Sequence, residues 1–493
     1  MTIKKEQTHY ISDKTGKKYF PTIGLEIHAE LKTKTKMFCS CKNDPFYSEV
    51  NQNICPVCTA HPGTLPYVNK QAVKDVLKVG LAINGKLADF SEFDRKNYFY
   101  PDIPKAYQIS QYKYPLISGG QILDVDITRI HLEEDTATSS HKDDFSLVDF
   151  NRAGVPLMEL VTEPVVTSSE QASAFAKRLQ LVLRTLDVSD ANLEKGQMRI
   201  EANVSVSEHG HFDGDFSKLG VKTEVKNLNS FKIVALAIEH EIQRQIEEIE
   251  NGNEVVQETR GWDENKQATF SQRKKENSDD YRYFPDPDIP KYKISEIEEF
   301  SEENLRKELP ELPDQTIARY KEFELKDDDI EFYLNNFDFR NLFDLCLEKI
   351  SDKKSIQLLS NYLSSDVAGY QKDESIEGEL QNIKSQNLID LVEMINDGDL
   401  SSRGAKDTLI LIYKNGGETK KTAEENGFIQ KSDMGELEQI AKKIVEQNPK
   451  QKEDFQNGEE KLIQYFIGQG MKETKGSANP QVLKEVFEKV LKS

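Results

Sequence analysis

Apolar and ionisable residues alternate over residues 23–31, where the sequence reads IGLEIHAEL. Ile23 and Leu25 fall on one side of this run, and Glu26 and His28 fall on the other. A period of two residues predicts a β-strand with one apolar face. The opposite face of this strand is expected to carry chemistry.

Further runs predict the surrounding elements. Short strand-like segments lie at residues 122–130, 198–206 and 221–225, whereas residues 171–186 and 230–249 show helical spacing of apolar positions. The strands and helices do not alternate regularly, so we expect an α+β domain around a mixed, largely antiparallel sheet rather than a parallel α/β fold.

The pattern changes after Pro290, because helical spacing then dominates and strand-like runs nearly vanish. We therefore predict three domains: a sheet-containing domain over residues 1–295, an all-α domain over 296–410 and a small all-α tail over 411–493.

Composition narrows the class of protein. The 493-residue chain has a net charge of −21, which argues against nonspecific coating of nucleic acid, since such binding needs surplus Lys and Arg. No run approaches the ~20 apolar residues of a membrane-spanning helix. Residues 1–10 lack the apolar segment of a signal peptide, so a cytosolic protein without membrane contact is expected.

Four of the five cysteines form two close pairs, Cys39 with Cys41 and Cys55 with Cys58. Four thiolates suit a tetrahedral zinc site in which the protein fills every position, so a structural role is favoured over a catalytic one. Four unmetallated thiols are the alternative. Cys346 stands alone among apolar residues and is expected to be buried.

Carboxylates and histidines recur beside apolar residues. Glu26 and His28 share a strand face, HLEED occupies residues 131–135, and PLMELVTEP occupies residues 156–164 and contains Glu159. Converging carboxylates would suit Mg²⁺, which takes oxygen ligands and retains water and substrate phosphates. Each carboxylate taken alone could instead be solvated or paired with a basic residue.

Basic side chains stand among aromatic and amide residues at Arg95, Lys96, Arg152, Lys226 and Arg282. They could contact the phosphates of ATP or the end of an RNA, or they could be structural ion pairs. The sequence has neither a P-loop nor a Rossmann glycine motif.

Two segments resemble each other, YFYPDIPKAYQIS at residues 98–110 and YRYFPDPDIPKYKIS at 281–295. Either two Pro- and Tyr-rich loops arose independently, or both loops border one site.

Longer motifs extend through most of the chain. They are IGLEIHAEL (23–31), FDRKNYFYPDIPKAYQISQY (93–112), ITRIHLEEDTA (127–137), DFNRAGVPLMELVTEP (149–164), EVKNLNSFK (224–232), QETRGWDE (257–264), DYRYFPDPDIP (280–290) and IGQGMKETKGSANPQV (467–482). In these motifs and their order, the chain resembles the GatB family, the B subunits of the aspartyl/glutamyl-tRNA(Asn/Gln) amidotransferases.

The resemblance implies a catalytic "cradle" domain, a helical domain and a tail similar to YqeY that contacts tRNA. It also implies the activity: ATP phosphorylates the side-chain carboxylate of Glu-tRNA(Gln) or Asp-tRNA(Asn), and ammonia released from glutamine by a partner amidase forms the amide. The implied protein partners are the amidase and the small subunit of a heterotrimer. A noncatalytic zinc-containing subunit that binds tRNA remains the alternative.

By this resemblance the ATP and Mg²⁺ site includes Glu26, His28, Glu133, Glu134 and Glu159, with His28, Glu134 and Glu159 as the closest Mg²⁺ ligands. The five basic residues above are candidates for contacts with phosphate or the acyl end. In the tail, Lys472, Lys475 and residues 476–480 match the family motif.

Overall fold

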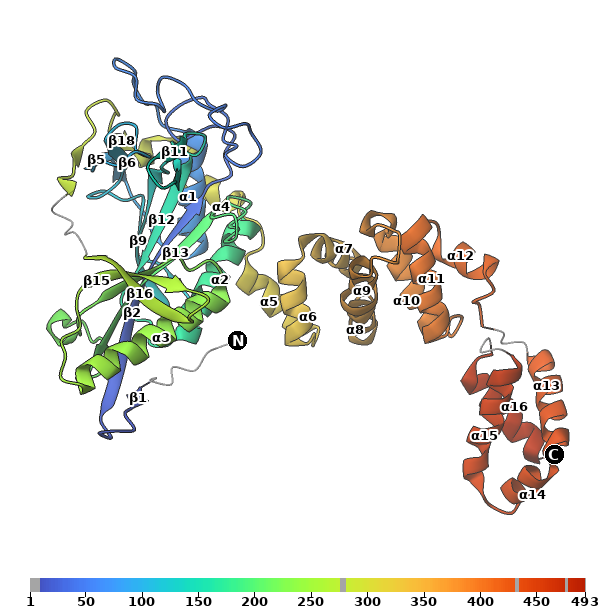
Figure 1. Ribbon diagram of the computed structural model, residues 1–493. Coiled ribbons are helices and arrows are strands. Elements are labelled where there is room, and N and C mark those ends of the chain that lie inside the picture. The colour runs from blue at the N-terminus through green and yellow to red at the C-terminus, as the bar shows by residue number, and fades with distance from the viewer. Residues whose placement is uncertain (1–8, 275–280, 431–433, 475–477, 493) are drawn as a thin grey trace. The chain divides into compact units, whose positions relative to one another are not determined.

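The computed structural model describes residues 9–274, 281–430, 434–474 and 478–492. The chain divides into two compact units, Met1–Pro313 and Asp314–Ser493 (Figure 1). The first unit contains every strand longer than an isolated bridge among the described residues, and the second is helical. The α+β class is therefore confirmed, and the three domain boundaries remain predictions.

An 11-stranded sheet forms the framework of the first unit. In spatial order its main path is β16 (Ala268–Lys274), β15 (Glu258–Asp263), β14 (Thr223–Lys226), β13 (Met198–Ser207), β2 (Lys18–Glu30), β12 (Pro156–Thr162), β9 (Val125–Glu134), β7 (Ile117–Ser118) and β3 (Lys86–Leu87). β1 (Tyr10–Ile11) pairs with β2, and β8 (Gln121–Ile122) pairs with β9. Among the described residues only β14 and β15 pair in parallel, so the predicted, largely antiparallel sheet is confirmed.

The segment expected to be one strand at residues 122–130 is interrupted by a tight turn, since Ile122 ends β8 and residues 125–130 belong to β9. Leu123 and Asp124 have φ angles of 48° and 61° and connect β8 to β9. Two successive positive φ angles are the mark of a mirror-image turn that matches strand twist. The Leu-Asp pair is an unusual choice for this turn, so the alternating pattern concealed it.

Three helices pack against the sheet: α1 (Lys70–Ala82), α2 (Ser169–Thr185) and α3 (Phe231–Glu250). Ser168 caps α2 by accepting a hydrogen bond from the backbone of Gln171, and Ser230 caps α3 in the same way. The helices bury the apolar face of β2, including Ile23 and Leu25, in the main core. The other face of β2, with its ionisable residues, is left for a site.

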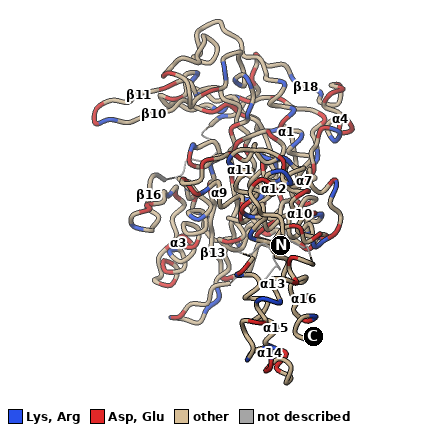
Figure 2. The backbone as a smooth tube through the Cα atoms, turned by 90° about the vertical axis from the view of Figure 1, so that its right-hand side faces the viewer, with Lys and Arg blue, Asp and Glu red and all other residues tan. Residues whose placement is uncertain are grey.

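Short strands hold the two similar loops side by side. They are β4 (Phe90–Ser91), β5 (Asp94–Asn97), β6 (Tyr107–Ser110), β17 (Phe284–Pro285) and β18 (Tyr292–Lys293). β17 pairs with β5 and β18 pairs with β4. The rings of Tyr98 and Tyr281, one from each loop, lie 5.7 Å apart. A separate hairpin, β10 (Thr138–His141) and β11 (Ser146–Asp149), projects from the unit (Figure 2).

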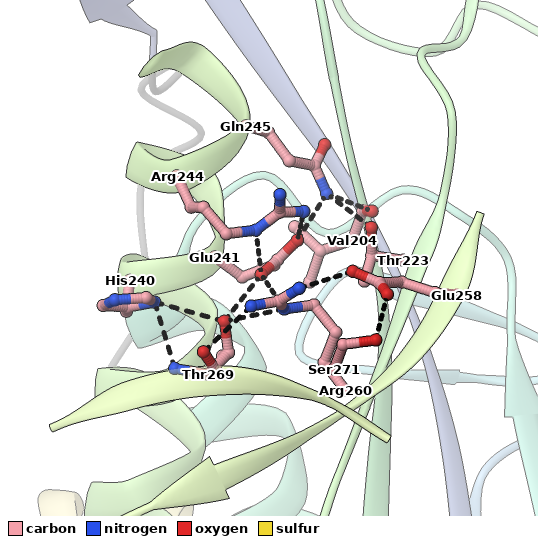
Figure 3. A network of polar contacts seen from close by, with 10 residues as sticks. All are labelled: Val204, Thr223, His240, Glu241, Arg244, Gln245, Glu258, Arg260, Thr269 and Ser271. Carbon is pink, nitrogen blue, oxygen red and sulfur yellow. Dashed lines mark hydrogen bonds and ion pairs between the residues drawn. The ribbon is translucent and has the colours of Figure 1, made fainter. Parts of the chain in front are cut away.

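A buried network of hydrogen bonds and ion pairs connects α3 with β15 and β16 (Figure 3). Glu241 is fully buried, and its carboxylate accepts hydrogen bonds from Arg244 at 2.6 Å and from the Thr269 hydroxyl at 3.0 Å. Arg260 lies 3.5 Å from the same carboxylate and also pairs with Glu258. Each charge of this network thus has a partner, as burial requires.

The second unit confirms the expected change to helices. Its helices are α5 (Pro313–Glu322, which begins at the boundary), α6 (Asp327–Asn335), α7 (Phe337–Leu347), α8 (Lys353–Asn361), a π-helical turn (Tyr362–Val367), α9 (Ala368–Lys372), α10 (Ser385–Asn396), α11 (Ser402–Asn415), α12 (Thr419–Glu425), α13 (Met434–Gln447), α14 (Pro449–Gln456), α15 (Ile463–Glu473) and α16 (Pro480–Lys492). The last helices share a core that includes Leu437, Phe466 and Phe487. α4 (Glu302–Lys307) belongs to the first unit. No helix within the described ranges could cross a membrane.

Candidate functional site

Strand register brings the ionisable residues of four strands into one row. Glu159 on β12 lies directly opposite His28 on β2 and His131 on β9. Arg199 on β13 lies opposite His28 on its other side. Residues two positions along a strand share a face, so Glu26 and Glu133 flank this row.

The carboxylate–histidine cluster consists of Glu26, His28, His131, Glu133 and Glu159. The Nε2 atom of His28 lies 3.3 Å from Oε2 of Glu159, 3.7 Å from Oε1 of Glu133 and 3.9 Å from Oε1 of Glu26. Nε2 of His131 lies 3.4 Å from the same Glu159 oxygen. Glu159, His131 and Glu133 are each at most 6% exposed.

This donor set fits a divalent cation. One group of three potential ligands is Glu26, His28 and Glu159, a second is His131, Glu133 and Glu159, and the ligand atoms within each group lie within 4.8 Å of one another. The carboxylates suit Mg²⁺ or Mn²⁺, and the imidazoles add a softer donor. Carboxylates alternating with imidazoles can hold a cation and leave positions for substrate oxygens.

The charges of the cluster depend on one another. Burial, together with the charge of Glu159, raises the pKa of Glu26 to about 7. Burial alone would lower the pKa of His28, but the neighbouring Glu159, Glu133 and Glu26 carboxylates raise it to about 9. Burial would likewise raise the pKa of Glu159, yet His131 and His28 hold it well below its usual range. A cation that entered would displace protons from this cluster.

Lys96 adds positive charge beside the cluster. Burial alone would lower its pKa, but Glu133, Tyr283 and Glu159 raise the pKa of Lys96 above its usual value. Its Nζ atom lies 5.1 Å from the ring centre of Tyr281. The ammonium group of Lys96, beside these carboxylates and aromatic rings, could therefore bind a phosphate group of a substrate.

The other expected basic residues have structural partners or are exposed. Arg95 donates to Asp286 at 2.8 Å, and Lys226 donates to Glu201 at 2.7 Å. Arg282 is exposed, in a left-handed backbone conformation with φ of 45°. Lys226 also interacts electrostatically with Glu26 of the cluster, so its bond to Glu201 does not separate it from the site.

Arg152 takes part in a second buried group, next to the cluster. Its Nε atom donates to the Thr136 carbonyl at 3.0 Å and lies 3.7 Å from Asp135. Asp135 accepts a shorter bond, 2.6 Å, from Arg199. Burial and the nearby Asp135 raise the pKa of Glu30 to about 8. Arg152 is therefore engaged by Thr136 and Asp135 within the protein, at the edge of the carboxylate–histidine cluster.

The structure differs from the expected grouping at Glu134. Successive strand residues point to opposite faces, so Glu134 faces away from Glu133 and is not among the potential ligands grouped around Glu159. Its carboxylate instead accepts hydrogen bonds from Lys105 at 2.6 Å and from the Ile109 backbone at 3.0 Å. The adjacent Glu133, and not Glu134, lies near His28 and is grouped with Glu159 as a potential metal ligand.

The four paired cysteines also come together, and their sulfur atoms lie within 4.8 Å of one another. The backbone N–H of Cys55 donates to Sγ of Cys58 at 3.2 Å, and Nζ of the buried Lys36 lies 3.8 Å from the same sulfur. A hydrogen bond from Cys39 and the charge of Lys36 lower the pKa of Cys58 to about 4. These features fit a zinc site with four thiolate ligands. Cys346 is buried, as expected.

Two residues beside the cluster, Arg129 and Arg199, were not expected from the sequence, and His131 was noted in the run at residues 131–135 but not predicted as a site residue. Arg129 lies 3.7 Å from Glu159. Period-two spacing could have indicated both β9 residues, because positions 129, 131 and 133 share a strand face. Arg199 enters only through the pairing of β13 with β2, which a single sequence does not reveal.

In the tail, Lys472 is exposed near the end of α15. Lys475, Gly476 and Ser477 lie outside the described residues.

Comparisons with known proteins identify the family to which the sequence belongs. Residues 21–299 match the GatB/GatE catalytic domain family, and residues 342–491 match the GatB domain family. The chain is 42% identical over 483 residues to a protein of Persephonella marina and 43% identical over 484 residues to one of Thermodesulfovibrio yellowstonii. Each match covers 96% of this chain and 99% of the relative, and both relatives are named as the B subunit of an aspartyl/glutamyl-tRNA(Asn/Gln) amidotransferase. The chain therefore belongs to the GatB family of amidotransferase subunits.

Proposed function

We propose that this chain is the subunit on which the side-chain carboxylate of Glu-tRNA(Gln), Asp-tRNA(Asn) or both is activated by ATP and amidated. The γ-phosphoryl group of ATP is transferred to a carboxylate oxygen, forming an acyl phosphate and ADP. Ammonia then attacks the acyl carbon, and phosphate leaves as the amide forms. The carboxylate–histidine cluster, centred on Glu159, is the observation that carries this proposal.

The chemistry explains why such a cluster is needed. A carboxylate is a poor electrophile until one of its oxygens becomes a good leaving group, and ATP brings further negative charge to the same place. Bound Mg²⁺ would neutralise charge on the phosphoryl group and orient it. Glu159, Glu133, Glu26 and His28 would hold that ion, and Lys96 would contact phosphate.

The remaining parts have supporting roles. The four-cysteine site would bind zinc structurally, since four thiolates leave no coordination position for substrate. The ammonia would come from glutamine hydrolysed by the partner amidase, with the small subunit completing a heterotrimer. The tail of the second unit, including the exposed Lys472, would contact tRNA away from its acyl end.

The test is an ATPase assay on the complex reconstituted with its amidase and small subunits. We expect ADP release that depends on misacylated tRNA, with matching formation of Gln-tRNA or Asn-tRNA. Correctly charged tRNA serves as the control. Amidation that persists without ATP would contradict activation by ATP, and tRNA binding without any ADP release or amide formation would instead support the noncatalytic tRNA-binding role.

A further inference from the structure

A buried lysine lies beside the four-cysteine site. Lys36 is 0% exposed and is the only buried lysine in the described part of the chain. Its Nζ atom donates to the Phe150 carbonyl at 3.1 Å and lies 3.8 Å from Sγ of Cys58. Among the described residues these are the polar partners of its side chain, and neither is a carboxylate. A buried ammonium group needs a compensating negative charge, and here the cysteine site is the group in contact that can supply it.

Backbone hydrogen bonds hold Lys36 in this place. Its N–H donates to the Cys41 carbonyl at 3.0 Å, and the N–H of Met37 donates to the Gly154 carbonyl at 2.7 Å. The segments are packed closely, because a Cβ atom added at Gly154 would lie 3.6 Å from side-chain atoms of both Lys36 and Cys58. The ammonium group is therefore built into the wall of the cysteine site.

The charge of a zinc–thiolate site explains the need for such a cation. Four thiolates carry two more negative charges than a zinc ion neutralises. Cys39 and Cys58 are only 3% and 4% exposed, so water screens little of this excess charge. The backbone N–H of Cys55 donates to Sγ of Cys58 at 3.2 Å, but it brings only a dipole. Groups that bond to metal ligands from outside orient those ligands and tune the metal.

We propose that the ammonium group of Lys36 is the counter-ion of the zinc–thiolate site and holds the Cys58 thiolate in position for the metal. Lys36 acts through Cys58, so it is a positioning residue and not a ligand. This inference rests on the zinc site of the proposed function and is independent of the carboxylate–histidine cluster.

The test measures the zinc affinity of the full-length chain by competition with a chromophoric chelator. Lys36→Met, which retains most of the bulk but not the charge, should weaken zinc binding about 10- to 100-fold, the range for loss of a group that supports a metal ligand. Lys36→Gln, which keeps a donor for the Phe150 carbonyl, should show a similar loss. The matched control is Lys42→Met, next to Cys41, because the Lys42 side chain is 68% exposed and pairs with Asp44. This variant should bind zinc as the wild type does.

Cobalt-substituted protein gives a readout that a purely structural role would not move. A positive charge beside a thiolate stabilises the sulfur electrons, so its loss should move the thiolate-to-cobalt charge-transfer band to longer wavelength. Both Lys36 variants should show this movement, and Lys42→Met should not.

Unchanged zinc affinity in a folded Lys36→Met chain, or a loss of affinity without movement of the cobalt band, overturns the proposal. Full affinity in Lys36→Gln also overturns it, because the hydrogen bond to Phe150 and not the charge would then be required. If Lys36→Met does not fold, Lys36→Gln decides by the same two readouts. A wild-type chain that binds no zinc would remove the proposed zinc site itself, whereas zinc binding that is equal in wild type and variants would remove only the role of Lys36.

Discussion

His28 and Glu159 face each other across the pairing of β2 with β12, with 3.3 Å between Nε2 and Oε2. Backbone hydrogen bonds of the sheet fix both residues, so their geometry does not depend on mobile loops. Exchanging a carboxylate for an amide here should therefore change the chemistry of the site with little movement of the backbone.

Neighbouring glutamates on β9 offer a matched pair of substitutions for the metal site. Glu133→Gln should weaken Mn²⁺ binding at least about 10-fold, because an amide at this position loses the charge that faces His28. Glu134→Gln should retain Mn²⁺ affinity, since Glu134 pairs with Lys105 on the other face. Electron paramagnetic resonance titration of Mn²⁺ measures both. The reverse order of effects would restore Glu134 as a ligand.

The cysteine site should contain about one zinc ion per chain in reduced, freshly purified protein. Cys55→Ser should lower the zinc content and the thermal stability together, because metal binding stabilises the folded state. Cys346→Ser, at the buried cysteine far along the chain, should retain the metal. Elemental analysis measures the zinc content of each protein. Wild-type protein without zinc would argue for four free thiols.

Glu241 should contribute strongly to stability. Its substitution by Gln leaves the largely buried Arg260 and Arg244 without their carboxylate, a loss of about 3–5 kcal/mol for breaking a buried ion pair. Glu247→Gln, on an exposed position of the same helix, should change the free energy of unfolding by less than ~0.5 kcal/mol. Urea denaturation of the two variants gives the comparison. Equal effects would mean that the network does not hold α3 to the sheet.

The same residue predicts a dependence on pH. Burial alone would raise the pKa of Glu241, but hydrogen bonds from Arg244 and Gln245 and the charge of Arg260 lower it. A lowered pKa stabilises the fold above the pKa of the unfolded chain, and this stabilisation is lost as pH falls through the folded value. Wild-type protein should therefore lose more stability than Glu241→Gln between neutral pH and about pH 3. Parallel losses in both proteins would contradict this assignment.

Much of the fold could be predicted from local patterns. Alternation at residues 23–31 predicted a strand with an ionisable face, and Ser168 and Ser230 precede helices that begin where expected. The turn at Leu123 was missed, because its residues are not those that usually adopt positive φ.

The site was harder to predict, because strand pairing and not sequence distance brings its residues together. Glu133 and Glu134 are indistinguishable in a run of acidic residues until the face of β9 is known. Arg199 joins His28 only through the register of β13. The two similar segments at residues 98–110 and 281–295 likewise come together only because β17 pairs with β5.

The most direct measurement is transfer of the labelled γ-phosphoryl group from ATP in the reconstituted complex with Glu-tRNA(Gln) and Asp-tRNA(Asn), comparing Glu159→Gln with Glu163→Gln. Glu159 is the centre of the carboxylate–histidine cluster, whereas Glu163 bonds to Thr128 beyond the end of β12. The account predicts that Glu159→Gln slows phosphorylation about 100- to 1,000-fold while tRNA binding persists, and that Glu163→Gln is near wild type. Wild-type phosphorylation rates in a folded Glu159→Gln complex would contradict the account.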